Sequence, residues 1–192
     1  MNPLPGIAVR PRVEPKGVLE TPRLVLRRYA LSDAPLLHHL IISNRSRLSQ
    51  FVYTVSGSST SENAERFVSH LIEEWEAHAC FTYGIYQRES GNLIGHLFIE
   101  SIEWQVPKCE LGYLIDQKET GKGYATEALN SVTDYCLRTL GMARVFLRIS
   151  TTNTGSLKVA EKAGYTREGV CRNDWKTLDG ELLDMVYFSV IP

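Results

Sequence analysis

The 192-residue sequence lacks several features that mark specialised classes of protein. No apolar run approaches the ~18 residues of a membrane-spanning helix, and the first residues lack the apolar core of a signal peptide. The formal net charge is −1, without the basic excess that is typical of nucleic-acid-binding proteins. The four cysteines are scattered and form no Cys-x-x-Cys pair. We therefore expect a cytoplasmic protein with reduced core cysteines that binds no nucleic acid, membrane or metal.

The apolar content is sufficient for one globular domain. Hydrophobic residues make up 43% of the chain, enough at this length to bury a sizeable core. Four prolines lie within residues 1–19, and proline fixes φ and has no N–H to donate. We therefore predict an extended N-terminal arm over residues 1–19 and a single domain over residues 20–192. The arm would pack on its own domain or on a second subunit, and a homodimer stays open.

The hydrophobic periodicity predicts a mixed α/β sheet. We expect six or seven strands, drawn from residues 23–29, 81–86, 92–104, 109–115, 143–150, 165–172 and 182–190. We expect four helices, which would begin after Ser32-Asp33, at the capping-box pattern Ser59-x-x-Glu62, after Gly123 and near Gly155. In the first of these helices, Leu36, Leu37 and Leu40 would share the buried face.

The most informative segment joins a predicted strand to a predicted helix through a glycine-rich turn. The strand Glu110-Leu-Gly-Tyr-Leu-Ile-Asp116 leads to Gly121-Lys122-Gly123, and Tyr124-Ala125 opens the helix. N–H groups at a helix N-terminus lack intrahelical partners, and the helix dipole favours negative charge there. Glycine lets a phosphate approach the backbone, and the lysine adds a cation. The turn therefore favours a diphosphate ligand; the alternative is a tight turn that binds nothing.

Two commoner phosphate-binding loops do not match this turn. The nucleoside triphosphate loop requires a glycine where Asp116 stands and a serine or threonine where Gly123 stands. The dinucleotide-binding motif requires a third small residue where Thr126 stands. The ligand is therefore expected to be a diphosphate of another kind.

A second segment, Asn153-Thr-Gly-Ser156 through Gly164-Tyr165, follows the predicted strand 143–150. With the glycine turn it resembles the GNAT superfamily of acetyl-CoA-dependent N-acetyltransferases, in particular the RimJ/RimL-type branch, which acetylates protein N-termini and has relatives that acetylate small amines. Three further segments have the same resemblance: Glu20-Thr-Pro-Arg23, Ile94-Gly95-His96 and residues 168–184. The resemblance covers about residues 20–190. It implies a mostly antiparallel sheet that splays between its fourth and fifth strands.

The resemblance also implies which residues bind acetyl-CoA. The diphosphate would lie on Gly121, Lys122, Gly123, Tyr124 and Ala125, and the pantetheine arm would pair with the backbone of Leu114, Ile115 and Asp116. The N–H of Ile115 would meet the thioester carbonyl, Asn153 would bind the pantetheine amide, and Ser156 would lie near the sulfur. The alternative for Leu114 and Ile115 is core packing, and for Asn153 and Ser156 it is helix capping.

Glu110 is the catalytic base that the resemblance implies, acting through water on the ammonium of the acceptor. The alternative is that Glu110 faces solvent or pairs with an arginine such as Arg148. Glu100 and Glu103 are rival bases or acceptor-recognition carboxylates, although exposed positions are the simpler expectation for both.

The leaving thiolate needs a different residue from the one that the family commonly uses. A tyrosine that protonates the thiolate in many GNAT enzymes is replaced here by Ala160, so Ser156 is assigned that role. His96 is expected to be a half-buried histidine with a hydrogen-bond partner rather than a catalytic one.

The expected function is acetyl transfer from acetyl-CoA to the N-terminal amine of a protein or peptide. Two alternatives stay open: acetylation of a small amine such as a polyamine or aminoglycoside, and a non-catalytic module that binds acetyl-CoA.

Overall fold

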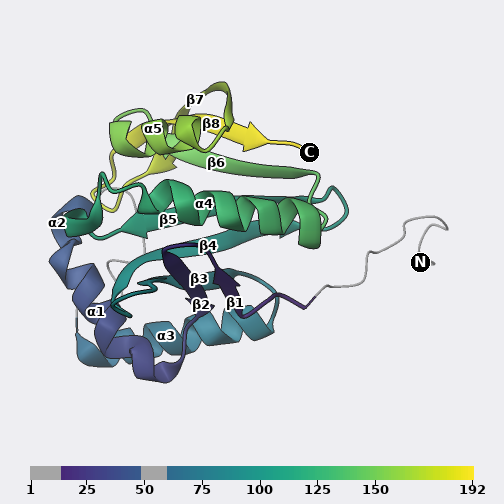
Figure 1. Cartoon of the computed structure of the whole chain (residues 1–192). Coiled ribbons are helices and arrows are strands. Elements are labelled where there is room, and N and C mark those ends of the chain that lie inside the picture. Colours follow the sequence, from purple (N-terminus) through teal and green to yellow (C-terminus); the bar gives the residue numbers. More distant parts are fainter. Residues whose placement is uncertain (1–13, 49–59) are drawn as a thin grey trace, which may run out of the picture.

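An eight-stranded sheet organises the described residues, 14–48 and 60–192, of the computed structural model (Figure 1). The strand order is β1-β2-β3-β4-β5-β6-β8-β7, and within these residues β5 and β6 form the one parallel pair. The strands are β1 (Val18–Glu20), β2 (Leu24–Arg28), β3 (Phe81–Gln87), β4 (Leu93–Glu103), β5 (Lys108–Ile115), β6 (Arg144–Ser150), β7 (Thr166–Lys176) and β8 (Leu182–Val190).

Helices pack against this sheet from several directions (Figure 1). The α-helices are α1 (Ala34–Ser43), the one-turn α2 (Arg45–Leu48), α3 (Ser61–Glu76), α4 (Tyr124–Asp134) and α5 (Thr154–Lys162). Short 3-10 turns cover Leu31–Asp33 and Gln117–Glu119, and a π-helical turn, Tyr135–Thr139, extends α4. Helices α1 and α3 pack on β4 and β3, whereas α4 packs on β5 and on the β1–β2 edge.

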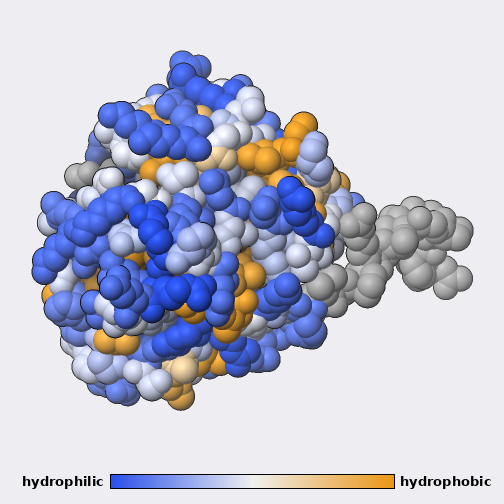
Figure 2. Space-filling view, viewed as in Figure 1, coloured by the Kyte–Doolittle hydropathy of each residue, from blue (hydrophilic) through white to orange (hydrophobic). Residues whose placement is uncertain are grey.

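The helices are amphipathic, which is why they cover the sheet. In α3, the buried residues Ala64, Val68, Leu71 and Trp75 recur at helical spacing. In α4, the corresponding residues are Ala128, Leu129 and Val132. The molecular face on which α4 lies is largely hydrophilic (Figure 2), because the opposite side of the helix is polar.

The strand count of six or seven was too low because β1 was not predicted. Val18–Glu20 pairs antiparallel with β2 at the edge of the sheet. It is only three residues long and mostly exposed, so the sequence contains no alternation that could reveal it. Val18 and Leu19, which we had assigned to the arm, therefore belong to the sheet. Residues 1–13 of the predicted arm lie outside the described residues.

Three details of the helices and cysteines also differ from expectation. The N-cap of α3 is Thr60, whose hydroxyl accepts from the N–H of Asn63; Ser59 lies outside the described residues. In α1, Leu36 is 47% exposed, and Ile41 is buried on the face that includes Leu37 and Leu40. Of the four cysteines, Cys109 and Cys136 are buried, Cys80 is half-buried and Cys171 is exposed, so the expectation of four core cysteines was wrong.

The predicted splay lies between β5 and β6, which are the fifth and sixth strands because β1 adds one. The two strands pair only where Lys108, Cys109 and Glu110 face Arg144, Val145 and Phe146. Beyond this point β5 continues to Ile115 and β6 to Ser150 without pairing to each other. The sheet therefore opens at the carboxyl ends of both strands, next to the glycine turn.

Candidate functional site

Two cavities meet at the splay between β5 and β6. The first, which we call the cofactor groove, has a volume of about 380 Å³ and is lined by the ends of β5, the 119–126 turn and the first turns of α5. The second, the acidic pocket, has a volume of about 120 Å³ and includes Glu100, Glu110, Arg148 and Trp175 in its lining. Both cavities are lined by Tyr113, Leu114, Asn153 and Ser156. A ligand in the groove therefore has direct access to the acidic pocket.

The glycine turn forms the N-terminal end of α4. Gly121 and Gly123 have φ of 79° and 83°, in the left-handed region that glycine adopts without strain. Gly123 is the N-cap of α4, and no side chain of the described residues caps this helix. The N–H groups of the first helical turn therefore lack an intrahelical partner, and the residues of this turn line the groove. Such an end suits an anionic group, and Lys158 and Lys162 add positive charge to the lining.

The motif around Thr21 and Arg23 holds this turn in place. The Thr21 hydroxyl and the Arg23 N–H both donate to Oε1 of Glu127, over 2.6 and 2.9 Å, and the Arg23 guanidinium bonds to Oε2. Burial alone would raise the pKa of Glu127, but these hydrogen bonds outweigh it and lower the pKa below its usual value. Arg23 also donates to the carbonyl of Lys122 and stacks on Tyr124. The segment between β1 and β2 thereby fixes the start of α4.

Eight of the ten residues that we expected to bind the cofactor line the groove: Leu114, Ile115, Gly121, Gly123, Tyr124, Ala125, Asn153 and Ser156. Lys122 and Asp116 do not. The Lys122 ammonium pairs with Glu119 at 2.9 Å, and its side chain is 51% exposed. The Asp116 carboxylate accepts from the N–H of Lys118, and the Asp116 N–H donates to the carbonyl of Ile94. Asp116 therefore shapes the end of β5 from outside the groove.

The start of α5 faces the junction of the two cavities. Asn153 is its N-cap, and the Asn153 side-chain oxygen accepts from the N–H of Ser156 over 3.1 Å. The hydroxyl of Tyr113 is buried at the same junction and makes no hydrogen bond with the described residues. Burial raises the pKa of Tyr113 to about 12. The hydroxyls of Tyr113 and Ser156 are thus protonated and available to a ligand at the junction.

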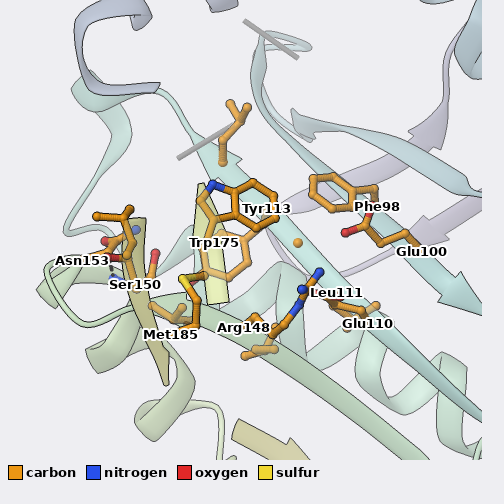
Figure 3. A pocket seen from close by; sticks show the side chains of 16 residues that line it. Phe98, Glu100, Glu110, Leu111, Tyr113, Arg148, Ser150, Asn153, Trp175 and Met185 are labelled. Carbon is orange, nitrogen blue, oxygen red and sulfur yellow. Dashed lines mark hydrogen bonds and ion pairs between the residues drawn. The ribbon is translucent and has the colours of Figure 1, made fainter. Parts of the chain in front are cut away.

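The carboxylates of the acidic pocket come from two adjacent strands (Figure 3). Glu110 is 6% exposed, and its Oε1 accepts from Nε of Arg148 over 2.9 Å, which is the ion pair we had considered as the alternative. Its Oε2 is buried without a partner among the described residues. Glu100, directly opposite on β4, lines the pocket rather than lying exposed.

The two other candidate residues, Glu103 and His96, do not line the acidic pocket. Glu103 pairs with Lys108 over 2.8 Å near the end of β4. His96 is 2% exposed, more buried than we expected, and its Nδ1 shares a hydrogen bond with the Tyr29 hydroxyl over 3.1 Å. Burial lowers the pKa of His96 to about 4, so the ring is neutral at ordinary pH and has a structural role.

Sequence reasoning missed several residues of the site, among them Tyr113 and Trp175. On β5, the period of two places Tyr113 on the opposite face from Glu110 and Leu114, so alternation alone does not bring it to the acidic pocket. Trp175 follows an irregularity in the pairing of β7 with β8, where Asn173 has φ of 54°. No sequence pattern predicts such a bulge.

Comparisons with known proteins agree with this architecture. The family described as acetyltransferase (GNAT) domain matches residues 23–166. The chain is 26% identical to the uncharacterized N-acetyltransferase p20 of Bacillus licheniformis, over 90% of this chain and 95% of the relative. It is 28% identical to the ribosomal protein uS5-alanine N-acetyltransferase of Escherichia coli, over 90% and 89%.

A solved structure has the same fold. It is that of RimL, a ribosomal L7/L12 α-N-protein acetyltransferase in complex with coenzyme A, with a TM-score of 0.83 at 22% identity over 91% of this chain and 97% of that one. Within residues 14–48 and 60–192, no helix is long and apolar enough to span a membrane. The same residues hold no cluster of three or more histidine, cysteine or acidic side chains placed to bind a metal ion.

Proposed function

Because the chain belongs to the GNAT acetyltransferase family, we propose that it transfers the acetyl group of acetyl-CoA to the N-terminal α-amine of a protein. The observation that supports this most directly is the shared wall of the two cavities. Tyr113, Leu114, Asn153 and Ser156 line both the cofactor groove and the acidic pocket, so a thioester and an amine would meet there. Acetyl-CoA supplies the activated acetyl group, and the protein supplies binding, orientation and proton transfer.

The groove fits the chemical parts of coenzyme A. The uncapped start of α4, with Gly121 and Gly123, suits the diphosphate, and Lys158 and Lys162 suit further phosphate charge. We propose that β5 beyond Glu110, where it does not pair with β6, receives the pantetheine amides in the way that an added strand would pair. The Asn153 and Ser156 side chains lie where the thioester would reach the acidic pocket.

The acidic pocket fits one ammonium group. With both carboxylates ionised, Glu100 and Glu110 outweigh Arg148 by one negative charge. Phe98 and Trp175 add apolar walls, and the volume of about 120 Å³ leaves room for a small N-terminal residue. A polyamine has several ammonium groups and would require more carboxylates than this pocket provides. The name of the Escherichia coli relative, an alanine N-acetyltransferase of a ribosomal protein, supports the same class of acceptor.

The test is a panel of acceptors compared by kcat/KM. Short peptides with free Ser, Ala or Met N-termini would be assayed beside spermidine, spermine and an aminoglycoside by release of coenzyme A thiol. We expect at least one peptide to exceed every small amine. A polyamine with higher kcat/KM than all peptides would support the small-amine alternative, and coenzyme A binding without thiol release on any acceptor would support the non-catalytic alternative.

Ser156 provides a second test of the site. We propose that its hydroxyl donates to the leaving sulfur, together with the Tyr113 hydroxyl beside it. A free thiol has a pKa near 8.5, so proton donation at neutral pH helps without being essential. Ser156→Ala is therefore expected to lower kcat about tenfold, measured at saturating acetyl-CoA. Weaker coenzyme A binding with unchanged kcat would instead make Ser156 a ligand contact alone.

Two further parts of the proposal concern the protein in its cell. We propose a homodimer and a cytoplasmic location. Sedimentation of the full chain would test the first, and a monomer would contradict it.

A further inference from the structure

The acidic pocket contains a pair of carboxylates in direct opposition. Glu100 and Glu110 are cross-strand partners on β4 and β5, so both side chains lie on the same face of the sheet. The Cβ atoms of such partners are roughly 4.5–5.5 Å apart. Figure 3 shows the two side chains on one side of the pocket, with Asn153 and Ser150 on the opposite side. The pair therefore faces the junction at which amine and thioester would meet.

The backbone changes direction immediately after Glu100. The pairing of β4 with β5 shifts between Glu100 and Glu103, and Ser101 has φ of 50°. A non-glycine residue in the left-handed region is uncommon, and bulges beside active sites redirect neighbouring side chains. The bulge lies between the two acidic residues of this strand: Glu100 lines the pocket, whereas Glu103 pairs with Lys108.

The two carboxylates have different partners. Oε1 of Glu110 is occupied by Arg148, and Oε2 is buried, lacks a partner among the described residues and belongs to a side chain that lines the pocket. A buried carboxylate oxygen without a donor is costly, and an ammonium group would supply that donor. Glu110 is therefore suited to bind the charged acceptor. Glu100 makes no ion pair with Arg148 and is the carboxylate left to take a proton.

We propose that Glu100 is the proton acceptor of the acetyl transfer, whereas Glu110, held by Arg148, binds the ammonium group. The inference rests on the proposed function and assigns its base. Glu100 takes one proton from the ammonium, and the nitrogen lone pair then attacks the thioester carbonyl carbon. The N–C bond forms, the C–S bond breaks, and the second amine proton ends on the leaving sulfur. Glu100 then releases its proton to solvent.

The electrostatic surroundings of Glu100 agree with this role. Burial raises the pKa of Glu100 to about 7, the charges of Glu110 and Glu74 add to the rise, and Arg148 opposes it. Glu74, on α3, itself pairs with His70 over 3.5 Å. Cys80 also lies near Glu100, and its pKa is raised to about 12, mainly by burial, so this thiol stays neutral. A base with a pKa near 7 is ionised above that pH and still basic enough to deprotonate an α-amine.

The direction in which kcat changes with pH follows from the protonation of Glu100. Below about pH 7, Glu100 becomes protonated and can no longer accept a proton, so kcat falls as pH decreases. The experiment measures kcat from pH 5.5 to 9 at saturating peptide and acetyl-CoA, because the free α-amine itself titrates near 7.7–8 and would otherwise dominate the profile. The variants are Glu100→Gln, Glu110→Gln and Glu100→Asp, with Glu103→Gln as the matched control from the same strand.

We expect Glu100→Gln to lower kcat about 100-fold at pH 8, with coenzyme A affinity unchanged. It should also abolish the fall of kcat below about pH 7, which is the low-pH limb of the profile. Glu100→Asp should retain the limb at a reduced kcat, which shows that the loss is not one of folding. Glu110→Gln should raise the KM for peptide and move the limb to lower pH, because a negative charge that raises the pKa of Glu100 is gone. Glu103→Gln should match the wild type.

A Glu100→Gln enzyme with the wild-type limb would overturn the inference, and loss of the limb in Glu110→Gln would assign the base to Glu110. A ¹³C NMR titration of the glutamate carboxyls, without substrate, gives a readout that needs no turnover. A carboxyl that titrates near pH 7 should be present in the wild type and absent in Glu100→Gln. If that carboxyl is present but no amine is acetylated, the proposed function fails; if amines are acetylated and the carboxyl is absent, only the assignment of Glu100 fails.

Discussion

In a Gly123→Val variant, the affinity for coenzyme A is expected to fall about 100-fold, a loss of about 2.8 kcal/mol. Gly123 has φ of 83°, which a β-branched side chain tolerates poorly, so the turn must distort. The added Cβ would also lie 3.4 Å from the Arg23 guanidinium, which holds the start of α4. The N–H groups that we propose for the diphosphate would therefore move away from it. Calorimetric titration with coenzyme A measures the effect.

The matched control is Gly91→Val. Gly91 has φ of 71° in the turn between β3 and β4, and a Cβ there would meet nothing within 4 Å. It therefore imposes the same kind of backbone strain outside the cofactor groove, and coenzyme A affinity should be unchanged. Equal losses of affinity in both variants would mean that strain alone explains the first result. Unchanged affinity in a folded Gly123→Val protein would contradict the assignment of the glycine turn.

A Gly95→Ala variant is expected to lower the free energy of unfolding by about 3 kcal/mol, the upper part of the range for overpacked cores. A Cβ at Gly95 would lie 2.6 Å from the carbonyl oxygen of Leu114 and 2.7 Å from Cδ1 of Ile115. The first of these is backbone and cannot move unless β4 and β5 separate. Leu114 and Ile115 also line the cofactor groove, so coenzyme A affinity should fall together with stability.

Thermal unfolding measures this effect, with Gly169→Ala as the control. Gly169 lies on β7, and a Cβ there would meet nothing within 4 Å. For a domain of this size, a loss of about 3 kcal/mol corresponds to a decrease in Tm of about 6–12 °C. A decrease no larger than that of Gly169→Ala would show that β4 and β5 accommodate the methyl group, against the geometry described above.

Predictions from the sequence were most accurate for residues whose conformation is set by their neighbours in the chain. Gly123 at the start of α4, Asn153 as the N-cap of α5 and the alternating strand 109–115 are set by nearby residues, and the structure has all three. Predictions were less accurate for residues whose contacts lie far away in the sequence. The bulge that follows Glu100 depends on tertiary packing, whereas the pairing of Lys122 with Glu119 is local and could have been anticipated.

The choice between Glu100 and Glu110 illustrates the same limit. The motif identified Glu110 as the base, and the possible pairing with Arg148 was recognised from the sequence. Arg148 lies on β6 beyond the last residues that pair with β5, and it bonds to Glu110. The choice of its carboxylate partner therefore depends on how the two strands splay. Oε2 of Glu110 lacks a partner among the described residues and Glu100 is half-buried; both follow from tertiary packing that no pattern in the sequence predicts.

The most direct test of the central claim uses one peptide with two competing amines. A peptide with a free N-terminal serine and one internal lysine would be incubated with acetyl-CoA at pH 7.5, and fragment masses would locate the acetyl group. An α-amine has a pKa near 7.7–8 and a lysine amine near 10.4, so the first requires far less from a base whose pKa is near 7. We expect acetylation of the α-amine alone. Acetyl on the lysine side chain with the N-terminus unmodified would contradict the account.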